Sequence, residues 1–265
     1  MKDLTGIGEL SANTMELVKM VYPDLLQPGV KKVGIALEST IDFLSIPVKH
    51  LGKIGQKSDI NISNHLNNYK VKLEKVPSDE IGTVPPEIGV PIIEDLTRVT
   101  NGDLASMYVN LLVNASTISR SKYTHPSFIN LIRSIAGDEA KIINHYKNGG
   151  EPILVKEFII EDSKDGTISK FDQLFINLED HIELQYPNNK SFYFSNLERL
   201  IVIDGEPNFT DDMASVVNEK TTLINSRVQE NNDKIQSLSN KSLSEIDLAY
   251  KLTNYGKDFV RSISI

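Results

Sequence analysis

The stretch GDEAKIINHYKNGGEPILVKEFII, residues 137–160, contains the change from helix to strand on which the expected fold depends. Its first part repeats apolar residues, from Ala140 to Tyr146, at the spacing of one buried helical face. The pair Gly149-Gly150 ends that pattern, and the run PILVKEFII (152–160) is rich in branched and aromatic residues, as strands are. Together the two patterns predict a protein that combines helices with a sheet.

Helical patterns occupy the chain before this stretch. Apolar periodicity and turn signals predict helices over 9–22, 28–46, 47–76 (with interruptions), 87–99 and 102–115, and a further helix that opens at His125-Pro126-Ser127. A turn-rich connector, PSDEIGTVPP (77–86), separates the first group of helices from the second. These segments predict an N-terminal helical bundle.

The second half predicts a small sheet among helices. After the strand at 152–160 we expect a turn at 164–166, a helix at 191–200, strands at 200–204 and 246–252, and a closing helix capped by Thr253. This order is close to that of a winged helix. The predicted fold is therefore mainly α (α+β), with a helical domain over 1–122 and a winged-helix-like α+β domain over 123–265. Residues 206–242 are polar and predict an exposed insertion, helix or loop, in the second domain.

Composition limits the compartment and the chemistry. The 265 residues include no cysteine, which excludes disulfides, thiolate metal sites and cysteine nucleophiles. The first twenty residues lack a basic region followed by an unbroken apolar run, so we expect no secretory signal and a cytoplasmic location. The most apolar stretch, 33–51, carries charged residues and Pro47, which argues against a membrane-spanning helix.

The charge distribution argues against nucleic-acid binding by the second half. The formal net charge is -8, and residues 149–265 alone contain twelve Lys and Arg against twenty Asp and Glu. A winged helix that binds DNA needs a basic recognition helix and wing, because phosphate contacts supply most of the affinity. A winged-helix-like part with this charge is expected to bind protein instead.

Arg120 and His125 are the only candidates for a catalytic pair. Their R-x4-H spacing resembles the short Arg/His signature of HEPN-type ribonucleases, in which a helix presents both groups to the RNA. Pro126 disfavours helical geometry at the residue before it, so His125 is expected in a loop or at a helix entry. A hydrogen bond from His125 near the start of its own helix is the expected structural role.

No motif for a metal or cofactor is present. His125, Asp138, Glu139 and His145 do not follow any standard ligand spacing, and the chain has only five histidines. The sequence also lacks a Walker loop, a Rossmann GxGxxG and a GxSxG elbow. We therefore expect no metal site, no cofactor and no complete catalytic constellation.

Several blocks occur in an order that resembles the Abi-alpha (abortive infection alpha) family. They are VYPDLLQPGVKKVG (21–34), VPPEIGVPIIEDL (84–96), LASMYVNLLVNAS (104–116) and THPSFINLIRSIAGDEAKII (124–143), followed by the weaker SNLERLIVI (195–203) and KLTNYGKDFVRSI (251–263). The most specific motif combines His125, Pro126, Ser127 and Phe128 with Asp138 and Glu139. No agreed catalytic residue transfers with this motif.

The resemblance implies a bacterial or phage-borne protein of abortive infection, in which an infected cell stops growing or dies before phage multiply. Our leading hypothesis is a defence protein that binds a phage or host protein and is not an enzyme. One alternative is a HEPN-like ribonuclease effector that uses Arg120 and His125. Another is an effector that perturbs membranes through the apolar and basic helices of 30–75. The sequence indicates no oligomeric state.

Overall fold

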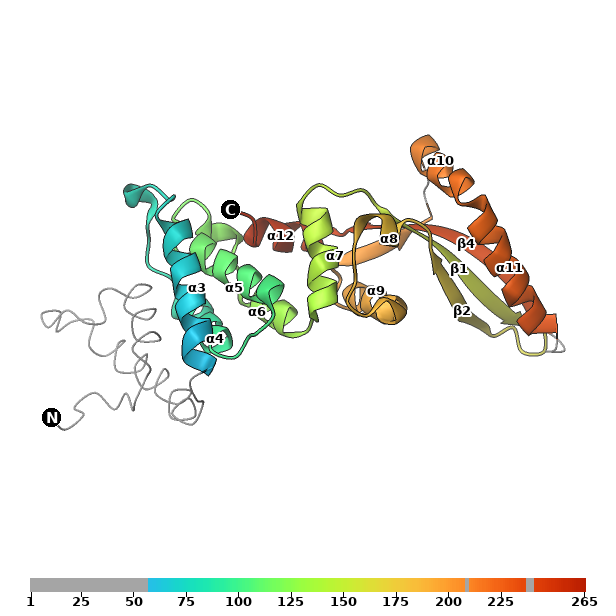
Figure 1. The fold of residues 1–265 in the computed structure, drawn as a ribbon, viewed down its shortest axis with the longest axis horizontal. Helices are drawn as coiled ribbons and strands as arrows, with labels where there is room; N and C mark the ends of the chain where they lie inside the picture. Colours follow the sequence, from blue (N-terminus) through green and yellow to red (C-terminus); the bar gives the residue numbers. More distant parts are fainter. Residues whose placement is uncertain (1–56, 208–209, 237–240) are drawn as a thin grey trace, which may run out of the picture. The chain divides into compact units, whose positions relative to one another are not determined.

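The computed structural model describes residues 57–207, 210–236 and 241–265 (Figure 1). Two predicted helices, 9–22 and 28–46, and most of the membrane-active segment proposed at 30–75 lie outside these residues. The described chain forms two compact units, one of residues 57–137 with 261–265 and the other of residues 138–260. The predicted domain division after residue 122 stays a prediction.

The first unit is helical. It contains α3 (Lys57–Leu73), α4 (Pro86–Leu96), α5 (Gly102–Ala115) and α6 (Pro126–Arg133), with single 3-10 turns η2 (Ser78–Glu80) and η3 (Ser121–Tyr123). Helix α5 is its centre, because every residue from Ala105 to Ala115 except Ser106 is buried. Helices α3, α4 and α6 pack against α5. An apolar helix surrounded in this way is expected to lie at the centre of a bundle.

Two asparagines of α5 hold the end of the chain within the first unit. The side-chain amide of Asn110 donates to the carbonyl of Ile263 at 2.8 Å, and that of Asn114 donates to the carbonyls of Ser262 and Ser264 at 2.7 and 2.9 Å. All are buried or partly buried. These bonds satisfy carbonyls at the end of α12 (Asn254–Ser262) that have no partner within a helix.

The second unit is built on a four-stranded antiparallel sheet. Its strands are β1 (Ile153–Asp162), β2 (Ile168–Phe175), β3 (Ile203–Glu206) and β4 (Lys241–Leu252), in the order β2-β1-β4-β3. The helices are α7 (Gly137–Lys147), the short α8 (Leu178–His181), α9 (Lys190–Arg199), α10 (Asp211–Glu219), α11 (Thr221–Gln236) and the first part of α12, with the 3-10 turn η4 (Pro187–Asn189) before α9.

Each face of the sheet packs against helix. On one face, Leu154, Phe158 and Ala249 form a core with Ile224 of α11. On the other, the ring of Phe194 of α9 lies 4.8 Å from that of Phe175 and 5.0 Å from that of Tyr250. The two sets separate because successive side chains of a strand point to opposite faces. In Figure 1, α11 lies along the sheet and continues from α10 with Lys220 alone between them, and we call the two helices the α10–α11 segment.

The predicted fold class is confirmed: the described chain is mainly helical, with a small antiparallel sheet. The second half follows the predicted order of helices and strands, with the short α8 added before α9 and with α10 and α11 between β3 and β4, where an exposed helix or loop was predicted. Residues 206–242 are the largest difference, because α10 and α11 place Met213, Val216, Val217 and Val228 against the sheet core rather than in solvent. The likeness to a winged helix stays a prediction.

Among the residues that the structure describes, no helix combines the length and the apolar character needed to cross a membrane.

Candidate functional site

His125 is the N-cap of α6. Its backbone is extended, at φ -140 and ψ 141, as expected before a proline. The ring Nδ1 accepts a hydrogen bond from the backbone N–H of Ser127 at 3.1 Å and lies 2.8 Å from the Ser127 hydroxyl oxygen. The ring also meets that of Phe128 edge to face, with centroids 6.2 Å apart. The motif His125-Pro126-Ser127-Phe128 thus forms a helix start.

Arg120 and His125 do not share a helix. Arg120 is the residue before η3, and the chain from there to His125 consists of a 3-10 turn and extended backbone. The backbone N–H of Arg120 donates to Thr117 at 3.0 Å, and its charge lies near the Glu80 carboxylate. The ribonuclease alternative stays a prediction, but the structure gives these two residues no common helical face.

Asp138 is the centre of a hydrogen-bond network in the second unit. Its carboxylate is 4% exposed and accepts from the backbone N–H groups of Gln185 and Tyr186, both at 2.8 Å, and from the Tyr193 hydroxyl at 3.2 Å. The ammonium of Lys141 lies 3.4 Å away. Burial alone would raise the pKa of Asp138, but these donors hold it below its usual range.

Glu139 makes a second tie from the same helical turn. It is 1% exposed, and its carboxylate accepts from the side-chain amide of Asn196 at 2.6 Å. Lys141, one turn further, donates to the carbonyl of Glu183 at 2.8 Å. The first turn of α7 therefore fixes the chain from residue 183 into α9. Asp138 and Glu139 lie in the first turn of α7, where acidic side chains also interact favourably with the positive end of the helix dipole.

The chain that Asp138 fixes carries two exposed aromatic side chains. Residues 185–193, which we call the aromatic segment, contain η4 and the start of α9. Tyr186 is 58% exposed and Phe192 is 68% exposed, whereas Tyr193 between the network and the core is 4% exposed. Aromatic side chains are enriched among the residues that contribute most to protein interfaces.

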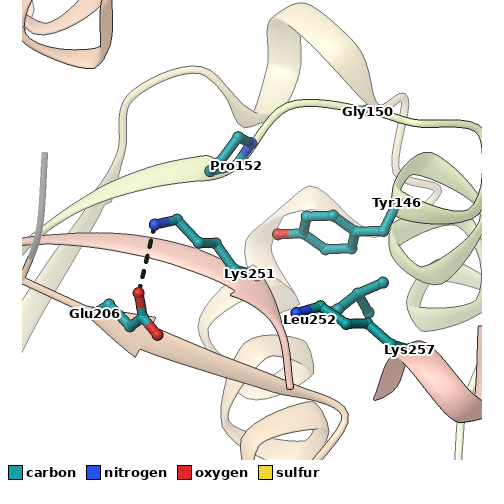
Figure 2. Close-up of a pocket in the computed structure, with 7 residues that line it drawn as sticks. All are labelled: Tyr146, Gly150, Pro152, Glu206, Lys251, Leu252 and Lys257. Atoms are coloured by element: carbon teal, nitrogen blue, oxygen red, sulfur yellow. Dashed lines mark hydrogen bonds and ion pairs between the residues drawn. The ribbon is translucent and has the colours of Figure 1, made fainter. Parts of the chain in front are cut away.

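A pocket opens elsewhere in the second unit, beside the ends of β3 and β4 (Figure 2). Its volume is about 370 Å³, and its lining residues are Tyr146, Gly150, Pro152, Glu206, Lys251, Leu252 and Lys257. In Figure 2 the phenol of Tyr146 reaches from α7 toward the middle of the pocket, and Lys251 points toward Glu206. The pocket thus combines two ammonium groups and one carboxylate with apolar surface.

The polar groups of this pocket differ in how firmly they are held. The Tyr146 hydroxyl donates to the carbonyl of Tyr250 at 2.9 Å, and burial raises the pKa of Tyr146, which keeps the phenol neutral. Lys251 pairs with Glu206 at 3.4 Å, but both side chains are well exposed. The ammonium of Lys257 forms no ion pair with any residue that the structure describes. The two lysines therefore remain able to bind a ligand.

Gly150 shapes the rim of the pocket. Its N–H donates to the carbonyl of His145 at 2.9 Å, and a Cβ at this position would come within 2.3 Å of the His145 ring. The His145 Nε2 lies 2.7 Å from the carbonyl of Glu151, which fixes the ring there. Only glycine fits at this position, so the pair Gly149-Gly150 does more than end a helix.

No cluster of three or more metal-binding side chains occurs in the described residues, and the four positions considered from sequence are not brought together. His125 lies in the first unit, whereas Asp138, Glu139 and His145 lie in the second. The residues of the pocket were not among the candidates from sequence, because 105 positions separate Tyr146 from Lys251. The one available signal was that Lys251 and Lys257 both lie in the block KLTNYGKDFVRSI.

Comparisons with known proteins give a family. One solved structure, that of an uncharacterized protein from the hydrocarbon-degrading marine bacterium Alcanivorax borkumensis SK2, is similar at a TM-score of 0.38 and 12% identity over 56% of this chain and 96% of that chain. A likeness at that level has no bearing on function. No curated protein matches the chain. The profile of a family described as abortive infection alpha matches residues 57–263, which is most of the chain. The protein therefore belongs to the abortive infection alpha family.

Proposed function

We propose that this protein acts in abortive infection by binding a protein of the phage or the host through the aromatic segment. The family implies a phage-defence role of the abortive-infection type. The step from that role to protein binding rests on one observation: the buried Asp138 fixes the segment that carries the exposed Tyr186 and Phe192.

The network of Asp138 supports binding because it reduces the cost of ordering the segment. Backbone that is already fixed loses little conformational freedom when a partner binds, so more of the contact energy appears as affinity. Aromatic side chains contribute most strongly at the centre of protein interfaces. The motif residue Asp138 would then act as a positioning residue for the interface, without contacting the partner itself.

The charge of the second half favours protein over nucleic acid as the partner. Residues 149–265 carry twenty acidic against twelve basic side chains. Glu179, Asp180 and Glu183 precede the aromatic segment, and all three are exposed. A phosphate backbone would be repelled by such a surface. The surface therefore fits a protein partner whose binding site is an apolar patch surrounded by basic residues.

The test replaces the two aromatic side chains together. Cells that carry the wild-type chain should lower the plating of sensitive phage, and Tyr186→Ala/Phe192→Ala should restore it, because each truncation at the centre of an interface typically costs more than about 1 kcal/mol of binding. Ile168→Ala, another exposed apolar residue at 67%, is the matched control and should leave protection unchanged. Affinity capture from infected cells should lose the same protein only in the double variant.

Full protection by the folded double variant would contradict the proposed surface. Absence of protection by the wild-type chain across a broad set of phages would contradict the defence role itself. A loss of protection counts as support only when the purified double variant unfolds at the wild-type temperature, since a misfolded protein would lose protection for a trivial reason.

A further inference from the structure

We propose that the pocket lined by Tyr146, Lys251 and Lys257 binds a small phosphate-bearing organic molecule. This inference goes beyond the proposed protein interaction, because none of the pocket residues lies in the aromatic segment. It rests on the size of the pocket, the two ammonium groups and the apolar wall between them.

The size of the pocket fits a small molecule. Its volume of about 370 Å³ lies at the lower end of the range of roughly 300–1,000 Å³ that is typical of ligand sites. Pro152 and Leu252 provide aliphatic surface, and the ring of Tyr146 provides an aromatic one (Figure 2). An organic group the size of a sugar or a nucleobase would cover these walls.

The charge of the pocket fits an anion. Lys251 and Lys257 contribute two positive charges and Glu206 one negative charge, so the lining carries a net charge of +1 within a half of the chain that is otherwise acidic. Lys257 lies at the start of α12, whose amino end carries further partial positive charge. Two ammonium groups at one pocket match the multiple oxygens of a phosphate better than a single carboxylate.

The ion pair of Lys251 with Glu206 can be exchanged for the ligand. Its atoms are 3.4 Å apart, and the side chains are 37% and 50% exposed. A pair in such a position contributes little to stability, because water and salt screen it. A phosphate of charge near -2 would therefore draw Lys251 away from Glu206. A ligand must compete with Glu206 for Lys251. Substitution of Glu206 should therefore raise the affinity for every anionic ligand of the site.

Tyr146 sets the boundary of the site. Its hydroxyl proton is donated to the carbonyl of Tyr250, so the phenolic oxygen offers the pocket only an acceptor. A hydroxyl of the ligand can donate to this oxygen, whereas a phosphate oxygen cannot. The phosphate is therefore placed at the lysines, and the organic part, with its hydroxyl groups, at Tyr146.

The experiment is titration calorimetry of the full chain with three probes: inorganic pyrophosphate, adenosine 5′-monophosphate and uncharged adenosine. We expect one site per chain for both charged probes and no measurable binding of adenosine. Lys251→Gln and Lys257→Gln should each weaken binding about tenfold, the loss expected for one charge-assisted hydrogen bond. Glu206→Gln should tighten it. Lys241→Gln, at the other end of β4, is the matched control and should bind as the wild type does.

The outcomes separate the parts of the proposal. Absence of binding by both charged probes at millimolar concentration, or binding that the two lysine substitutions leave unchanged, would overturn the site. Equal affinity for the nucleotide and pyrophosphate would overturn the role of the apolar wall and Tyr146. Thermal unfolding without ligand should be the same in all variants, because the exchanged side chains are at the surface. Plating of phage is not the measurement, so failure of this site leaves the proposed protein interaction intact.

Discussion

Asp138 shows at the scale of single residues how a motif position can serve structure. Its carboxylate accepts from backbone groups 47 and 48 positions further along the chain, and from a hydroxyl 55 positions further along. The two backbone donors, Gln185 and Tyr186, come from a loop without regular secondary structure, whereas Tyr193 lies in α9. Without the carboxylate, these two partly buried backbone N–H groups would lose their acceptor, which costs free energy. The carboxylate is therefore required by its partners as much as by the helix that carries it.

The first prediction concerns Asp138→Asn. The amide offers one acceptor oxygen where the carboxylate offers two, and its NH₂ group faces donors, so we expect a loss of about 1–3 kcal/mol in the free energy of unfolding. Urea denaturation at pH 7 measures it. Asp211→Asn is the matched control, since Asp211 is an exposed aspartate in the first turn of α10. Equal effects of the two substitutions would contradict the role of the network.

Ile201 is strained in a way that the sequence did not reveal. Among the described positions, it is the one residue other than glycine whose φ is positive, at 59°. The N–H of Val202 donates to Leu197 at 2.9 Å and that of Ile201 to Glu198 at 2.8 Å, which is the Schellman pattern at the end of α9. Glycine is preferred there, because a branched side chain is crowded in the left-handed conformation. The side chain is nevertheless 63% exposed.

The second prediction follows from that strain. Ile201→Gly should raise the free energy of unfolding by about 0.5–1 kcal/mol, because relief of the backbone outweighs the extra freedom of glycine in the unfolded chain. Ile168→Gly serves as the comparison, since Ile168 is as exposed but lies in β2, where glycine weakens a strand. Thermal unfolding should therefore move in opposite directions for the two variants. Destabilisation by Ile201→Gly would show that the side chain contributes more than the strain costs.

At the scale of elements, the α10–α11 segment completes the core of the second unit. Ile224 is 8% exposed and belongs to the cluster that includes Leu154 and Phe158. Polar contacts fix the register of the helix on the sheet: Asp172 of β2 accepts from Arg227 at 3.1 Å and from Asn231 at 3.0 Å. Without the α10–α11 segment, the face of the sheet that carries Leu154 and Phe158 would expose large apolar side chains.

The third prediction tests whether α11 packs on the sheet, by substituting two neighbouring residues of this helix. Ile224→Ala should lower the free energy of unfolding by about 2–4 kcal/mol, the cost of truncating a buried aliphatic side chain. Leu223→Ala should change it by less than about 0.5 kcal/mol, because Leu223 is 47% exposed. Guanidinium denaturation followed by circular dichroism measures both. Similar losses of unfolding free energy for the two variants would show that α11 is not packed on the sheet.

The same elements show what the sequence could predict. Helix α5 was predicted over the residues that it occupies, because the turn signal Asn101-Gly102 marks its start and apolar residues follow on one face; the structure adds that Asn101 caps the helix. Residues 206–242 were predicted to be exposed because their few apolar residues lie among many Asn, Gln, Glu and Ser. The apolar side chains against which they pack belong to the strands of the sheet, which local sequence does not reveal. Local patterns reveal a cap or a stripe, whereas the face that receives a stripe is set by long-range packing.

The candidate functional residues were likewise predictable only where a local sequence signal exists. The position of His125 at a helix entry was predicted from Pro126 alone, and the structure shows the expected hydrogen bond. The pocket and the aromatic segment were not predicted, because each gathers residues from separate elements. Tyr186 and Phe192 have no sequence signal that distinguishes them from core aromatics such as Tyr193 and Phe194. Exposure, which separates the two pairs, exists only in the folded chain.

At the scale of the whole molecule, the carboxyl groups give stability two opposing dependences on pH. The pKa values of Asp138, Glu80, Asp165 and Glu230 are lowered in the folded chain, chiefly by hydrogen bonds that outweigh burial where burial is present. A lowered pKa contributes stability that is present above the unfolded value and is lost as the pH falls through the folded value. Glu198 is opposite, because burial raises its pKa.

The fourth prediction separates the two dependences. Because burial raises the pKa of Glu198 above 4.5 in the folded chain, its ionisation there carries a penalty that is present at neutral pH and is lost as the pH falls below the unfolded value. Glu198→Gln should therefore raise the midpoint of urea unfolding at pH 7 and leave it unchanged at pH 4. The loss caused by Asp138→Asn should persist at both values and shrink only as the pH falls through the lowered pKa of Asp138. Glu219→Gln, at an exposed position of α10, should follow the wild type throughout. A gain from Glu198→Gln that is as large at pH 4 as at pH 7 would show that the substitution acts through packing, since charge cannot contribute equally on both sides of the titration.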